Sequence, residues 1–153
     1  MKETLGRLFR YNEWANGEAL RSLRSMGAPP QKAVQLLAHI IAAEWLWLER
    51  IQSFGQSHPV WPEWTLDEIE PQLARVSQAW RVFLNRGGEP ELAREFEYTN
   101  TKGEHYRNAV GDVAMHVAMH GTYHRGQIAL LVRQNDSQPA YTDFIQAVRA
   151  EGI

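Results

Sequence analysis

The sequence predicts an all-α fold, a four-helix bundle with a short β-hairpin before the last long helix. Two observations carry this prediction. Apolar residues recur at helical spacing over four stretches, and glycine- and proline-rich segments separate the first three. Ahead of the fourth stretch, aromatic and charged residues alternate instead, which is typical of strands. With 153 residues, of which 44% are hydrophobic and 22% charged, we expect residues 1–153 to form a single domain with its own core.

Composition narrows the class of protein. The net charge is −2 and no run of lysine and arginine occurs, so a nucleic-acid partner is not expected. No apolar run reaches transmembrane length and the N-terminus does not resemble a signal peptide, so we expect a cytoplasmic protein without a membrane partner. Cysteine is absent, which excludes disulfides, thiolate metal ligands and a cysteine nucleophile. Any thiol chemistry must use a thiol that arrives with a substrate.

The first helix is predicted over residues 3–25, where Gly27 and the following proline pair end it. Asn12 and Asn16 lie on its apolar stripe, one turn apart. Buried amides must be hydrogen-bonded. Either they bond inside the bundle, or this stripe faces a polar pocket.

The second helix is predicted over residues 31–53 and is apolar nearly all round, which indicates a buried helix. His39 lies in its middle, where a lone histidine is more often a core residue than a ligand. The loop over residues 54–64 is rich in glycine, proline and tryptophan. It is long enough to let the third helix run parallel to the second.

The third helix should begin with a capping box at Thr65 and Glu68. Because Pro71 clashes with a preceding helical turn, we expect a first turn at 65–69 and a regular helix over 71–85, ended by the Gly87–Gly88 pair.

Residues 94–107 predict the hairpin, with turn chemistry at 100–103. The fourth helix should then cover residues 108–134, and one more short helix should cover 141–150.

Three histidines follow one another at steps of four in the fourth helix: His116, His120 and His124. Residues four apart share a helix face, so two imidazoles can reach one metal ion. His116 and His124 lie about 12 Å apart along the axis, too far for one ion with bonds of about 2 Å. One adjacent pair is therefore the candidate. Asp112 extends the stripe of histidines by one more turn. Val113 and Val117 flank the stripe on the side expected to face the core, so we expect the histidines not to face solvent.

Four segments together resemble the DinB-like family of four-helix-bundle metalloproteins: LFRYNEWANGEAL, LLAHIIAAEWLWLERI, YTNTKGEHYR and MHVAMHGTYHRGQIALLVRQ. The resemblance implies an up-down-down-up bundle, a homodimer, and a divalent metal ion (zinc, nickel or iron) held by His39, His120 and His124. His116 matches a position that often holds histidine without being a ligand. Some members are thiol transferases or isomerases that use a low-molecular-weight thiol, and many others have no assigned reaction.

Three neutral imidazoles leave open positions on such an ion. We therefore expect a metal-dependent enzyme that activates a water or an external thiol, of hydrolase or thiol-transferase type, acting on a small molecule. The alternative is a non-catalytic metal-binding stress-response protein, a sensor or store, and a third reading is histidines with a purely structural role. The glutamate of an H-E-x-x-H motif is replaced by Gly121. A proton carrier would have to be another residue: Asp112 through His116, Tyr123, Asn12 or Asn16.

The six tryptophans favour self-association. A bundle of this size cannot hide every large ring in its core, and symmetric dimers are the commonest outcome.

Overall fold

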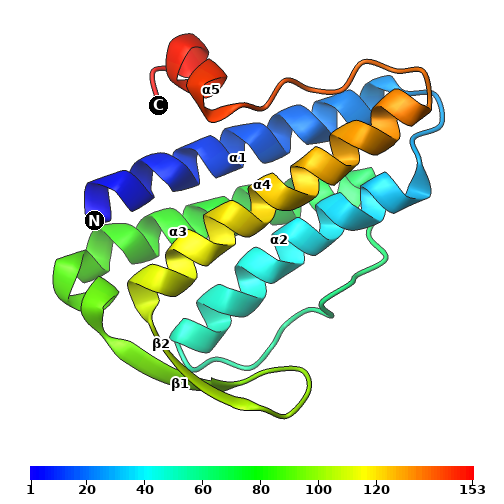
Figure 1. The fold of residues 1–153 in the computed structure, drawn as a ribbon. Coiled ribbons are helices and arrows are strands. Elements are labelled where there is room, and N and C mark those ends of the chain that lie inside the picture. Colours follow the sequence, from blue (N-terminus) through cyan, green and yellow to red (C-terminus); the bar gives the residue numbers. More distant parts are fainter.

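The computed structural model describes all 153 residues and contains four long helices, one short helix and one hairpin (Figure 1). The elements in chain order are α1 (Lys2–Ser25), α2 (Gln31–Ile51), α3 (Leu66–Ala93), β1 (Glu95–Thr99), β2 (His105–Ala109), α4 (Val110–Gln134) and α5 (Phe144–Glu151). The predicted all-α class with a hairpin before the last long helix is confirmed.

The four long helices form an up-down-down-up bundle. Figure 1 shows α1 and α4 running in one direction and α2 and α3 in the other, with the loop between α2 and α3 returning the chain along the bundle. The most extensive helix contacts are those of α1 with α3 and of α2 with α4, and α1 also packs against α4. The pairing of α2 with α4 matters most here, because these two helices carry the candidate ligands.

The third helix differs from its prediction at both ends. The capping box at Thr65 and Glu68 is present, but the helix continues from Leu66 through Pro71 without a break. Pro71 lies exposed near the helix start, where the carbonyl left without its N–H partner can reach water. The helix was predicted to end at Gly87 and Gly88, but the structure shows only a kink there. Gly88 takes a φ of 65°, which glycine tolerates, and helix then continues to Ala93.

Smaller differences concern three other boundaries. Helix α2 ends two residues earlier than predicted, at Ile51, and α4 begins two residues later, at Val110, because residues 108 and 109 belong to β2. The last short helix lies at Phe144–Glu151 rather than at 141–150.

The core is centred on Trp80 of α3, which is fully buried. Its ring stacks on Phe9 of α1 with centroids 4.5 Å apart, and its indole N–H donates to the backbone carbonyl of Glu44 in α2 at 3.0 Å. One side chain thus fixes three helices against one another.

The hairpin covers the end of the bundle where α2 finishes and α4 starts. Its strands are antiparallel, with Phe96 opposite Asn108. Tyr98 meets Trp47 of α2 edge to face at 5.1 Å. None of the helices combines the length and the apolar character that crossing a membrane requires. The cytoplasmic location stays a prediction.

Candidate metal centre

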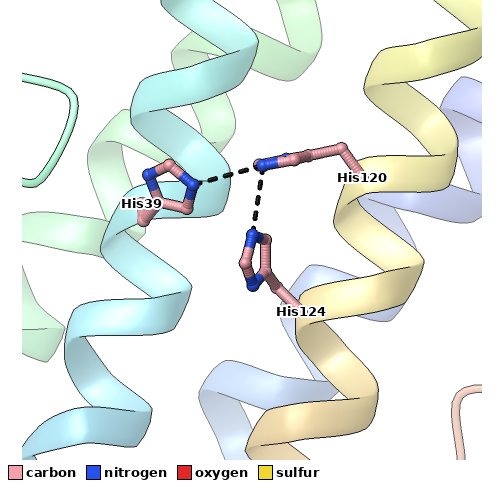
Figure 2. A group of neighbouring side chains, drawn as sticks. All are labelled: His39, His120 and His124. Carbon is pink, nitrogen blue, oxygen red and sulfur yellow. Dashed lines mark hydrogen bonds between the residues drawn. The ribbon is translucent and has the colours of Figure 1, made fainter.

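Three histidine side chains from two helices converge between α2 and α4. Figure 2 shows His39 reaching across from α2 toward His120 and His124 on α4. The Nε2 atom of His120 lies 3.2 Å from Nε2 of His39 and 3.1 Å from Nε2 of His124. One potential ligand atom from each residue lies within 4.8 Å of the others, an arrangement that could hold a metal ion. Two nitrogens on a tetrahedral zinc, each about 2.05 Å from it, would be about 3.3 Å apart.

The other ring nitrogens show how the rings are oriented. Nδ1 of His39 lies 2.8 Å from the carbonyl oxygen of Val60, which can only accept. Nδ1 of His124 lies 2.6 Å from Oε1 of Gln127. Each Nδ1 therefore carries the proton and donates, so both Nε2 atoms present lone pairs to the centre. Such outer hydrogen bonds are the usual support of histidine ligands.

Burial favours the neutral form of two of the three rings, and the neutral form is the one that binds a metal ion. Burial, reinforced by the neighbouring imidazoles of His124, His39 and His116, lowers the pKa of His120 to about 3. Burial also lowers the pKa of His39. A single proton on Nε2 of His120 could donate to only one of the two facing lone pairs at a time. A cation at the centre would satisfy all three nitrogens together.

The loop between α2 and α3 covers one side of the centre. Trp61 stacks on the ring of His39, with centroids 3.7 Å apart and planes inclined by 7°. The neighbouring Val60 supplies the carbonyl described above. On the other helix, Tyr123 lies edge to face with His124 at 5.1 Å. Sequence reasoning missed Val60, Trp61 and Gln127. Only Gln127, three residues after His124, offered a signal, because that spacing brings it to the same helix face.

His116 does not join the three converging rings. It meets Trp47 edge to face at 5.5 Å, and its ring centroid lies 5.7 Å from that of His120. The expectation that the stripe avoids solvent is met by the half-buried His120 and His124. It is wrong for His116, which is exposed although its ring meets Trp47 of α2.

A second polar cluster lies on the other side of α4. Asn12 and Asn16, 1% and 0% exposed, donate to the carboxylate of Glu44 at 2.7 and 2.9 Å. Their amide oxygens accept from Nη1 of Arg125 at 2.6 and 2.7 Å. Of the two readings left open for the asparagines, the first is the one observed, because they bond inside the bundle. We call these four residues the amide bridge.

Burial governs the charges of the amide bridge. It raises the pKa of Glu44 to about 7, although Arg125 and the two amides oppose the shift. It also lowers the pKa of Arg125. The carboxylate and the guanidinium do not touch, so each relies on the amides between them.

Gly121 makes room for this cluster. A Cβ atom there would lie 2.5 Å from Oδ1 of Asn12 and 2.8 Å from Nη1 of Arg125. The position that carries glutamate in an H-E-x-x-H motif is thus needed here for close packing. Sequence reasoning missed Glu44, which lies in an otherwise apolar helical run, and Arg125, which lies among the polar residues of HGTYHRGQ.

Comparison with known proteins agrees with this architecture. The chain is 25% identical over 162 residues to "Protein DinB" of Bacillus subtilis (strain 168), a match that covers 94% of this chain and 93% of the relative. The family model of the DinB family matches residues 1–151. A match over nearly the whole length shows that the chain belongs to the DinB family.

Proposed function

We propose that the protein binds one divalent metal ion through His39, His120 and His124 and uses it to activate a water or an external thiol. The observation that carries this proposal is the convergence of three Nε2 atoms, two of them with their protons fixed on the opposite nitrogen. Zinc, nickel and iron all accept imidazole nitrogen.

A bound ion of this kind lowers the pKa of a coordinated water or thiol and favours the anion. The histidines supply no negative charge, so they leave that effect undiminished. The chain has no cysteine, so a thiol nucleophile would have to come from a small-molecule substrate. This supports a reaction of hydrolase or thiol-transferase type.

The second candidate is a non-catalytic metal-binding protein, a sensor or store. One observation favours it. The buried carboxylate of Glu44 accepts hydrogen bonds from Asn12 and Asn16. No carboxylate belongs to the group that could hold the ion. A catalytic reaction would therefore depend on a base outside this group, such as Tyr123 beside His124, Asp112 through His116, or solvent.

We also propose a homodimer of single-domain chains. The tryptophans give this less support than expected, because Trp80 is buried and only Trp61 is largely exposed. Helix α4 adds three exposed apolar side chains, Met119, Tyr123 and Leu130, which are 65%, 67% and 53% exposed. Sedimentation that shows only monomer at micromolar concentration would contradict the dimer.

Elemental analysis of untagged protein purified without chelator tests the metal site. We expect about one ion per chain in the wild type, and loss of the ion in His39→Ala, His120→Ala and His124→Ala. His116→Ala should keep the ion and serves as the matched control from the same helix. Loss at 116 with retention at 124 would show that the ligand assignment is wrong. Turnover by the loaded wild type, assayed with a panel of thiols and esters, then separates the enzyme from the sensor or store.

A further inference from the structure

A cavity of about 290 Å³ lies between α2, α4 and the hairpin. It is lined by Trp47, Tyr98, Asn108, Asp112, Val113 and His116. Helices α2 and α4 and both strands of the hairpin contribute to it.

The cavity and the candidate metal centre are neighbours along the same two helices. Trp47 follows His39 by eight residues on α2, and Asp112 precedes His120 by eight residues on α4. Eight residues correspond to about 12 Å of helix. His116 stands between the two, with its ring close to both His120 and Trp47. A small molecule bound to the ion at one end could therefore place its other end in the cavity.

The side chains of the cavity determine what that end should be. The hydroxyl of Tyr98 donates to Oδ1 of Asn108 at 3.0 Å, which occupies the amide oxygen. The guanidinium of Arg50 lies over the rings of Trp47 and Tyr98, 4.8 and 5.3 Å from their centroids. Arg50, which does not line the cavity, thus already makes cation–π contacts with the rings of Trp47 and Tyr98.

Asp112 is the one anionic side chain of the cavity. It forms no ion pair with any basic side chain of the protein. A carboxylate in the first turn of a helix also stabilises the helix dipole. That role is independent of any ligand, so ligand selectivity distinguishes the two.

We propose that this cavity binds the far end of the metal-bound small molecule and prefers a molecule that carries an ammonium group there, paired with Asp112. The inference rests on the proposed function and narrows its substrate class to long amino-substituted thiols. Anionic ends would be disfavoured by the same carboxylate.

The test uses the cobalt(II)-loaded protein and a set of straight-chain thiols. Binding is followed by the sulfur-to-cobalt charge-transfer absorption. The probes are octanethiols that end in an amine, an alcohol or a carboxylate, together with the short pair 2-aminoethanethiol and 2-mercaptoethanol. For an exposed ion pair, we expect the long amine to bind about three- to fivefold more tightly than the long alcohol. The long carboxylate should bind most weakly, and the short pair should show no difference that depends on Asp112.

Two variants make the comparison specific. Asp112→Asn should remove the preference for the long amine and leave binding of the long alcohol unchanged. Asp136→Asn, which makes the same change at the exposed far end of α4, should keep the preference. Thermal unfolding of both variants shows whether the fold is intact.

The outcomes separate the inference from the function on which it rests. If thiols produce the absorption band but amine, alcohol and carboxylate bind equally, or if Asp112→Asn keeps the preference, the cavity inference is overturned and thiol binding stands. If no thiol produces the band in protein that contains cobalt, the cavity inference and the thiol part of the proposed function both fail, and metal binding with activation of water stands.

Discussion

Glu44 should make the protein less stable as the pH rises, which is unusual for a carboxylate. Its pKa in the folded protein is raised by burial from an ordinary value of 4.5 to about 7. Between these values the folded state holds a proton that the unfolded state has released. The stabilising contribution is therefore complete below pH 4.5 and is lost as the pH rises through 7.

The size of the effect follows from the two pKa values. A rise from 4.5 to about 7 corresponds to about 3 kcal/mol, at about 1.4 kcal/mol per pH unit. Between pH 5 and pH 8, the free energy of unfolding should fall by about 2.5 kcal/mol because of this one group. Glu44 is buried, so solvent screening does not reduce the figure.

The histidines of the candidate metal centre act in the opposite direction. The pKa of His120 is lowered to about 3, so its contribution is present above the ordinary value of 6.5 and is lost as the pH falls toward 3. A pH profile of the wild type alone would mix the two effects. Glu44→Gln keeps the shape of the side chain and removes only its titration, so the difference between the two proteins isolates Glu44.

The assay is urea denaturation of metal-free wild type and Glu44→Gln, followed by tryptophan fluorescence between pH 5 and pH 8. The variant should gain about 2.5 kcal/mol relative to the wild type across this range. Glu63→Gln, which removes an exposed carboxylate from the loop, controls for the change in net charge. Parallel profiles for wild type and Glu44→Gln would refute the raised pKa and with it the account of the amide bridge.

Two further predictions concern α4. Gly121→Ala should destabilise the protein by about 1–3 kcal/mol, because its Cβ would collide with the amide bridge. Gly126→Ala, which meets nothing within 4 Å, should stabilise it by roughly 1 kcal/mol, and urea denaturation of the pair measures both. Gln127→Ala should lower metal affinity by about 10- to 100-fold in a chelator competition, since it frees Nδ1 of His124. The exposed Gln134→Ala should not, and equal affinities would remove Gln127 from the site.

The sequence predicts the helices well because each is encoded by a local pattern. The capping box at Thr65 and the apolar run around His39 depend only on near neighbours, and both appear in the structure. The predicted break before Pro71 is wrong because it assumed the clash that a proline makes with the preceding turn inside a helix. An exposed site near the helix start tolerates it.

The candidate metal centre could be predicted only in part. Spacing alone brings His120 and His124 to one face of α4, but it equally pairs His120 with His116. The resemblance to a known family favours the pair His120 and His124, and the structure brings these two, but not His116, into one group with His39. The support of His39 by Val60 is a contact across 21 residues, and no local pattern encodes it.

The segment HGTYHR makes contacts on two sides of α4, because its residues form two adjacent stripes on the helix. His120 and His124 form the stripe that faces α2, and Gly121 and Arg125, each one residue later, form the stripe that faces the asparagines of α1. One residue is a turn of about 100° on a helix, so the two stripes lie on different sides of α4. The amide bridge therefore limits how far α4 can rotate about its own axis. Metal–ligand distances tolerate deviations of only about 0.2 Å, so a helix held on both sides suits the ligand role proposed for His120 and His124 better than one held by apolar contacts alone.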